Sequence, residues 1–188
     1  MTHDPLTTKN ATALGTSRAR LSRGARSGRY DRIARGIYRP SGADPADMDV
    51  VEAAARRPDA TICLMSALAH HGLTDEIPAA LDVAIPRGTR IPVTEGAIAW
   101  HVFDKASFNV GREEMAIPGT AGLRIGMYSP ERCIADAYRL RGELGYETAT
   151  HALRAWLNRG GKPTLLVEIA DQLPRAKSPL MQALSTLT

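Results

Sequence analysis

The chain has 188 residues, and its hydrophobic content of 44% is that of a globular protein. It has no apolar run long enough to span a membrane, and its first residues, MTHDPL, lack the basic start of a secretory signal. We therefore expect a cytoplasmic protein with no membrane partner. Two cysteines 70 positions apart, Cys63 and Cys133, exclude a disulfide framework and predict buried thiols.

The net charge of +4 is unevenly distributed along the chain. Residues 1–42 carry nine basic and two acidic side chains, a net charge of +7, and the remainder carries 15 basic and 18 acidic ones. Eight of the nine basic residues are arginines. The sequence thus has a strongly basic N-terminal segment, which we call the head, and a nearly neutral remainder, which we call the body.

Two helices and a hairpin are predicted in the head. TTKNATAL (7–14) and TSRARLSRGARSG (16–28) have helical patterns separated by Gly15. Thr16 or Ser17 can cap the second helix, and Gly28 can end it. RYDRIARGIYRP (29–40) is typical of a hairpin that turns at Gly36.

The turn-forming segment PSGADPAD (40–47) marks a linker, so we predict two domains, residues 1–42 and 43–188. In the body, helices are expected at 48–57, where Asp47 supplies the cap, and at 61–72. Strand patterns follow, and then a helix begins at Pro130 with Ser129 as its cap. The predicted strands cover 81–85, 97–103, 112–117 and 122–128, and later helices cover 146–158, 163–173 and 178–187. The predicted fold class is α+β: a winged helix-turn-helix followed by a small, mostly antiparallel sheet and C-terminal helices.

The second helix of the head has one apolar side and one cationic side. Leu21 and Ala25 share the first, and Arg20, Arg23 and Arg26 spread over the second with Arg23 at its centre. Arginine presents a planar fork to phosphate oxygens and to guanine O6 and N7, so this pattern predicts a recognition helix for double-stranded DNA. A solvated charged face, an RNA partner and an anionic membrane are the alternatives. The head is poor in aromatic residues that stack on single-stranded bases, which disfavours RNA.

These residues carry a resemblance to a known family. LGTSRARLSRGARSGRYDRIARGIYRP (14–40) resembles the N-terminal winged helix of AbiEi-type antitoxins. In the body, CLMSALAHHGLTDEIP, LDVAIPRGTR and YSPERCIADAYRLRGELGYETATHALRAWL are similar to the family's C-terminal domain.

The resemblance implies a transcriptional autoregulator of a type IV toxin-antitoxin pair. It would bind inverted repeats in operator DNA with the head and counter a nucleotidyltransferase-like toxin with the body, possessing neither a cofactor nor a metal. The implied DNA contacts lie on the second helix and the hairpin: Ser17, Arg18, Arg20, Arg23, Arg26, Arg32 and Arg35. The family's winged helix begins with a further helix upstream of TTKNATAL, for which only about six residues are present here. The sequence leaves the oligomeric state open, a monomer in solution included.

An enzymatic function is not expected. Cys63 and His70 lie on one stripe of a predicted helix but about 10 Å apart along it, too far for a nucleophile and its base. His71 is interpreted as a core or capping residue, and His101 and His151 as ordinary, partly exposed residues. Asp136 is expected to form local ion pairs with Arg132 and Arg139. The alternatives to an antitoxin that represses its own operon are a generic winged-helix regulator and a module that neutralises a partner protein directly through the helix face around Trp156.

Overall fold

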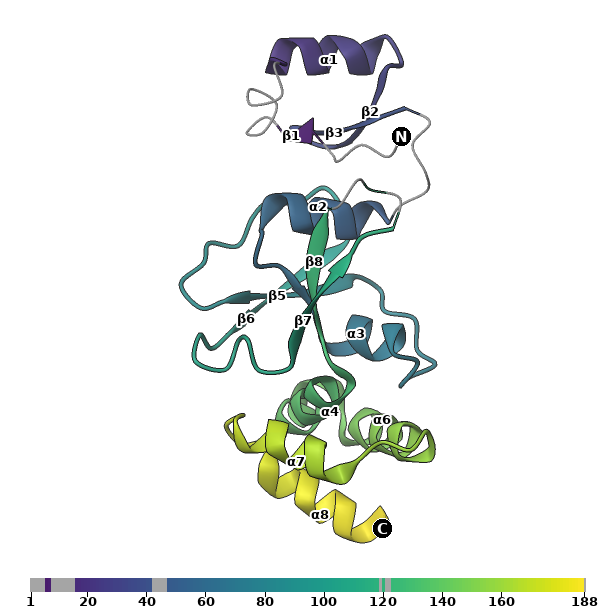
Figure 1. The fold of residues 1–188 in the computed structure, drawn as a ribbon, viewed down its shortest axis with the longest axis vertical. Helices are drawn as coiled ribbons and strands as arrows, with labels where there is room; N and C mark the ends of the chain where they lie inside the picture. The colour runs from purple at the N-terminus through teal and green to yellow at the C-terminus, as the bar shows by residue number, and fades with distance from the viewer. Residues whose placement is uncertain (1–5, 8–15, 42–46, 119, 121–122, 188) are drawn as a thin grey trace. The chain divides into compact units, whose positions relative to one another are not determined.

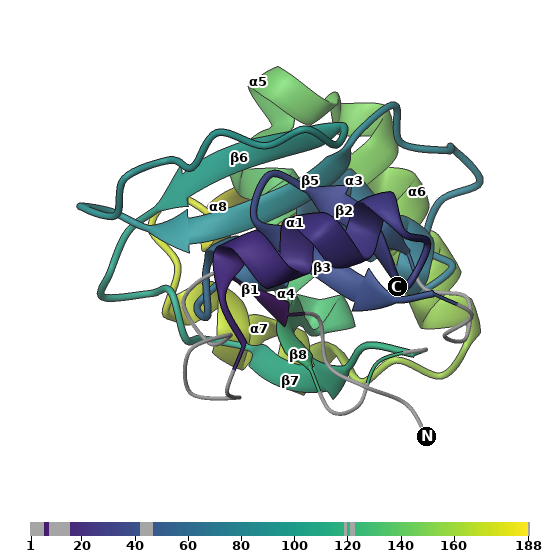
Figure 2. The same ribbon diagram turned by 90° about the horizontal axis from the view of Figure 1, so that it is seen from above.

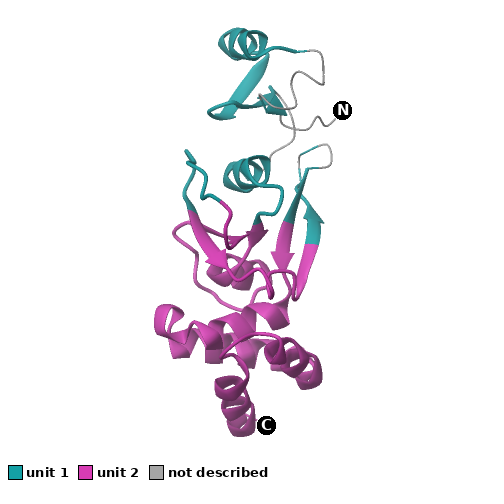
Figure 3. Ribbon diagram, turned by 90° about the vertical axis from the view of Figure 1, so that its left-hand side faces the viewer, with its two compact units in different colours: residues 1–60, 90–98, 114–125 teal, residues 61–89, 99–113, 126–188 magenta. Residues whose placement is uncertain are grey.

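A computed structural model describes residues 6–7, 16–41, 47–118, 120 and 123–187. The described residues form eight helices and two sheets, which confirms the α+β class (Figure 1). The chain divides into two compact units (Figure 3). Unit 1 comprises residues 1–60, 90–98 and 114–125, and unit 2 comprises residues 61–89, 99–113 and 126–188. The predicted domain boundary after residue 42 lies within unit 1 and stays a prediction.

The helix of the head, α1, spans Arg18–Arg26. Its cap is Ser17, whose Oγ accepts a hydrogen bond from the Arg20 amide at 3.2 Å. Gly28 follows the helix with a φ of 72°, a conformation that costs glycine no steric strain. The cap, the helix and its end are as the sequence predicted.

Three short strands form the antiparallel sheet of the head: β1 (Leu6–Thr7), β2 (Tyr30–Ala34) and β3 (Ile37–Pro40), in the order β1-β3-β2. The predicted hairpin is β2 and β3, and Gly36 in its turn has a φ of 82°. The predicted helix over 7–14 is wrong at Thr7, because Thr7 pairs with Ile37 as a strand residue. The remainder of that helix, residues 8–15, lies outside the described residues.

Helix α1 covers one face of this sheet (Figure 2). Leu21 from the helix and Tyr38 from β3 form a buried core, and Leu6, Ala25 and Tyr30 pack against it. The apolar side of α1 is therefore used for packing, which turns the arginine side outward.

Helix α2 (Met48–Arg56) begins at the predicted cap, Asp47, whose carboxylate accepts from the Asp49 and Val50 amides. Glu52 of α2 is 2% exposed and accepts from the backbone amides of Glu95 and Gly96 at 2.9 to 3.2 Å. A buried carboxylate thus fixes the loop that carries Glu95, and all of these residues belong to unit 1.

The second sheet has the strand order β6-β5-β4-β8-β7. Its strands are β4 (Thr61–Ile62), β5 (Leu81–Pro86), β6 (Ile98–Phe103), β7 (Arg112–Ala116) and β8 (Arg124–Tyr128). Strand β4 pairs antiparallel with β5 and parallel with β8. The predicted helix over 61–72 is wrong in its first turn, since helix α3 spans only Leu64–His70. The β-branched pair Thr61 and Ile62 is buried between two strands, and periodicity alone does not distinguish so short a strand from a helical turn.

The C-terminal helices are α4 (Pro130–Arg139), α5 (Arg141–Leu144), α6 (Tyr146–Asn158), α7 (Pro163–Asp171) and α8 (Lys177–Leu187). Helix α4 packs against α6, α7 and α8 (Figure 1). Its predicted cap, Ser129, accepts from the Arg132 amide. On α6, Trp156 is 6% exposed and belongs to the core.

Candidate nucleic-acid interface

The outward side of α1 is cationic. The side chains of Arg18, Arg20, Arg23 and Arg26 are exposed, and α1 contains no acidic residue. Among the residues that the structure describes, no carboxylate is recorded in an ion pair with any of these four arginines. This face is positively charged and can attract a polyanion. The described parts of the protein do not neutralise its charge.

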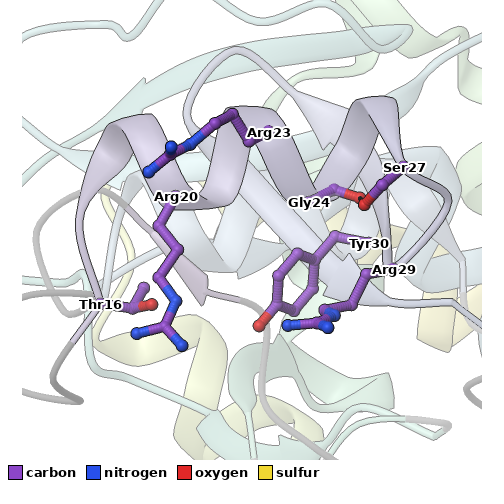
Figure 4. A pocket seen from close by; sticks show the side chains of 7 residues that line it. All are labelled: Thr16, Arg20, Arg23, Gly24, Ser27, Arg29 and Tyr30. Carbon is purple, nitrogen blue, oxygen red and sulfur yellow. Dashed lines mark hydrogen bonds between the residues drawn. The ribbon is translucent and has the colours of Figure 1, made fainter.

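A pocket of about 440 Å³ lies beside α1 (Figure 4). Of the residues that the structure describes, seven line it: Thr16, Arg20, Arg23, Gly24, Ser27, Arg29 and Tyr30. Three of them are arginines and none is acidic. Two of the predicted contact residues, Arg20 and Arg23, are therefore brought together here, whereas Ser17, Arg18 and Arg26 lie on α1 outside this lining.

Gly24 explains how a tyrosine comes to line this pocket. A Cβ atom at position 24 would lie 2.7 Å from Tyr30 Cε2, so only glycine leaves room for the ring against the helix. Glycine in a helix interior costs about 1 kcal/mol relative to alanine. This cost is offset by the packing of Tyr30, and the ring is held at the edge of the pocket.

The hairpin arginines have different surroundings. Arg32 Nη2 lies 3.1 Å from Glu95 Oε1, and the same oxygen accepts from the Arg35 amide at 2.6 Å. Arg39 is buried at 8% exposure and is 3.8 Å from Asp31. Arg32 and Arg35 are thus exposed residues whose donors meet Glu95, while the Arg39 guanidinium is largely withdrawn from solvent.

Five lining residues lie outside the sequence-based set of contacts: Thr16, Gly24, Ser27, Arg29 and Tyr30. Arg29 was available as part of the arginine run, and Gly28 is the local signal for a helix end after which the chain turns back beside α1. A bond from the Arg29 amide to the Gly24 carbonyl oxygen, at 2.8 Å, makes this return. Glu95 was missed because it is 60 positions from Arg35.

The histidines and thiols of the body have structural partners. His71 is partly buried and is the C-cap residue of α3, and its Nε2 is 2.8 Å from the Tyr128 carbonyl oxygen, in agreement with its interpretation as a core or capping residue. His101 is less ordinary than predicted, because its Nε2 is 2.8 Å from Asp82 Oδ1. The other Asp82 oxygen accepts from Ser66, so the aspartate lies between the serine and the histidine. That order prevents the imidazole from taking the serine proton directly, which a serine nucleophile requires.

Both cysteines are buried and free, as predicted. Burial raises the pKa of each thiol well above its ordinary value, so neither is a thiolate near neutral pH. Within the described ranges, no group of three or more His, Cys, Asp or Glu residues is arranged to hold a metal ion. None of the described helices combines the length and the hydropathy needed to cross a bilayer.

Comparison with known proteins finds a family model that is similar to the head. Residues 1–41 match the family model of a class of transcriptional regulators. That family is the AbiEi antitoxins, so the resemblance noted in the sequence is confirmed for this segment. No curated protein matches the chain.

Proposed function

We propose that this protein is a DNA-binding antitoxin that represses its own toxin-antitoxin operon, with α1 as the recognition helix of a winged helix-turn-helix and the β2–β3 hairpin as its wing. The observation that carries this proposal is the exposed arginine side of α1, opposite a side that packs on a sheet. The family match of residues 1–41 to antitoxin regulators supports the same function.

The proposed DNA contacts are those predicted from the sequence: Ser17, Arg18, Arg20, Arg23, Arg26, Arg32 and Arg35. An α-helix fits the major groove of B-DNA, where arginine binds guanine through two hydrogen bonds. Arg23 extends from the middle of α1 and is the candidate for such a contact. Arg35 lies in the hairpin turn and is the candidate for a backbone phosphate.

The test measures Arg23→Ala and Arg35→Ala on operator and random duplexes across a salt series. Arg23→Ala should cost about 1 to 3 kcal/mol on the operator and little on random DNA. Arg35→Ala should weaken both alike and reduce the slope of log affinity against log salt by about one unit per protomer. Equal losses for the two variants on both duplexes would remove the base contact, and unchanged binding in both would place the DNA surface elsewhere.

The second half of the proposal is that the body counters a nucleotidyltransferase-like toxin in the cytoplasm, as a type IV antitoxin. It rests on the resemblance of the body to the family's C-terminal domain. Combining Arg20→Ala with Arg23→Ala should abolish repression and leave growth rescue from the co-expressed toxin intact. Loss of rescue by this folded double variant would contradict a division of labour between the predicted domains 1–42 and 43–188.

Direct neutralisation of a protein partner through the face around Trp156 receives less support. That indole is in the core, so substituting it would disturb packing before it disturbed an interface.

A further inference from the structure

We propose that the pocket beside α1 holds one phosphate group of the DNA backbone, and that Arg29 and Tyr30 bind this phosphate together with Arg20. The inference rests on the proposed DNA-binding function and goes beyond it by assigning a subsite to residues outside the expected contact set. Figure 4 shows the guanidinium ends of Arg20 and Arg29 and the Tyr30 hydroxyl pointing in the same direction, out of the pocket lining.

The positive charge of the pocket favours an anionic ligand. Among the described residues of its lining, Arg20, Arg23 and Arg29 are charged and none is acidic. The nearest acid in sequence, Asp31, is engaged elsewhere: Ser41 Oγ donates to its Oδ1 at 2.8 Å, and Arg39 approaches its Oδ2. Successive strand residues point to opposite faces, so Asp31 lies on the other face of β2 from Tyr30. An anion bound here would lower the repulsion between the guanidinium groups of Arg20 and Arg29.

The backbone of this pocket is fixed before any ligand arrives. The Arg29 amide donates to the Gly24 carbonyl oxygen at 2.8 Å, and Ser27 Oγ donates to the same oxygen at 3.1 Å. The Tyr30 ring contacts the helix at Gly24, as described above, which holds its hydroxyl at the rim. Because these groups are already ordered, binding costs less conformational entropy than it would for a free arginine run.

The chemistry of the lining favours phosphate among anions. Guanidinium groups form paired hydrogen bonds with phosphate oxygens, and a tyrosine hydroxyl supplies a further donor. The volume of about 440 Å³ exceeds that of a bare phosphate ion and leaves room for the attached sugars. The exposed Arg18 and Arg26 extend the cationic surface along the same helix, so a continuous backbone fits better than a free nucleotide.

The experiment is a double-mutant cycle on a short mixed-sequence DNA duplex, measured by fluorescence anisotropy with the full chain. Tyr30→Phe keeps the ring that packs on Gly24 and removes only the hydroxyl, and Arg29→Gln removes the charge. Each single variant should weaken binding about tenfold, the value for one lost charge-assisted hydrogen bond. Because both residues hold one phosphate, Tyr30→Phe should have little further effect in the Arg29→Gln background.

Arg26→Gln is the matched control, since it removes an equal charge from the same helix outside the pocket. Its effect should add fully to that of Tyr30→Phe. Circular dichroism of each variant checks that the fold is retained. Full additivity of Tyr30→Phe with Arg29→Gln, or wild-type affinity in either single variant, overturns the subsite.

A second arm titrates inorganic phosphate and a deoxynucleoside monophosphate by calorimetry. We expect binding of each to be far weaker than binding of the duplex. The assignment to the DNA backbone would be overturned if the nucleotide bound tightly and Arg29→Gln abolished that binding without changing duplex affinity. Failure of the wild-type chain to bind any duplex would overturn the proposed function together with this subsite, whereas wild-type binding with unaffected variants would overturn the subsite alone.

Discussion

Arginines on helices α1 and α4 of this protein have opposite surroundings. On α1 they are exposed, and the described residues around them provide no carboxylate. On α4, Arg132 is fully buried: its Nε is 2.8 Å from Asp136 Oδ2, and its Nη1 donates to the carbonyl oxygens of Ser107 and Val110. The Arg132 guanidinium also lies 4.3 Å from the centre of the Tyr128 ring.

The burial and the partners of an arginine in this chain indicate whether it stabilises the fold or is available for binding. A buried guanidinium that pairs with a carboxylate and donates to carbonyl oxygens, as Arg132 does, stabilises the fold, because removing it leaves buried acceptors unpaired. A guanidinium on a surface without acids contributes little to stability and remains available to a polyanion. Variants in the two regions should therefore divide cleanly between stability and DNA affinity.

The largest expected effect is that of Arg132→Met. The variant keeps the apolar stem, leaves the Ser107 and Val110 carbonyl oxygens without their donor, and takes from Asp136 one of its two arginine partners. Breaking a buried ion pair in this way costs about 3 to 5 kcal/mol, which urea unfolding followed by circular dichroism would measure.

The matched control is Arg154→Met on α6, where the arginine is exposed. We expect its free energy of unfolding to change by no more than about 0.5 kcal/mol. DNA affinity per folded molecule should be unchanged in both variants. A loss at Arg132 as small as that at Arg154, or a selective loss of DNA affinity at Arg132, would contradict the division between the two regions.

An intermediate effect is expected from Gly24→Ala, which tests whether the Tyr30 ring determines the shape of the head. Alanine gains about 1 kcal/mol of helix propensity. Its Cβ would lie 2.7 Å from Tyr30 Cε2, and overpacking of this kind costs about 1 to 3 kcal/mol. We expect a net loss of about 1 kcal/mol, measured by hydrogen exchange of the α1 amides.

The same substitution in a Tyr30→Ala background supplies the control. Without the ring, only the gain in helix propensity remains, so Gly24→Ala should become stabilising. If Gly24→Ala stabilises α1 in the wild-type background as well, the contact between glycine and ring does not constrain the head.

The sequence predicted those elements that have local signals. Ser17 and Gly28 bound α1, Gly36 marks the hairpin turn, and Ser129 with Pro130 starts α4, since caps and turns act over a few residues. The local ion pairs of Asp136 with Arg132 and Arg139 were predicted from helical spacing as well. That this cluster is almost completely buried was not, because burial depends on the strands and loops around it.

The errors and omissions arise where long-range pairing decides the outcome. Thr7 and Thr61 are strand residues only because they pair with β3 and with β5 and β8, so their own neighbours do not indicate a strand. The pairs of His101 with Asp82 and of Arg32 with Glu95 bridge 19 and 63 positions. For the candidate interface, the sequence predicted the cationic side of α1 but not the pocket, because helical periodicity does not indicate that the Tyr30 side chain of β2 packs on Gly24 of α1.

The smallest predicted effect concerns Glu95, the acidic residue that contacts the cationic surface of the head. Its carboxylate accepts hydrogen bonds from two donors that a DNA phosphate would otherwise bind, the Arg32 guanidinium and the Arg35 amide. The buried Glu52 carboxylate accepts from the backbone amide of Glu95, which fixes the position from which the Glu95 side chain extends. DNA bound at the wing must displace this carboxylate.

We therefore predict that Glu95→Gln tightens DNA binding. Exposed ion pairs are worth about 0.2 to 1 kcal/mol, and both side chains here are 50% exposed, so releasing Arg32 should raise affinity no more than about fivefold. Glutamine retains an acceptor for the Arg35 amide, which limits the loss of stability. Glu113→Gln, an equal change of charge at an exposed position, separates this contact from a general reduction of negative charge. Arg32→Ala should also weaken binding more in the Glu95→Gln background than in the wild-type chain, because only there is the guanidinium free before DNA arrives. Equal affinity gains in the two glutamine variants would mean that Glu95 acts through net charge alone and that Arg32 does not contact the DNA.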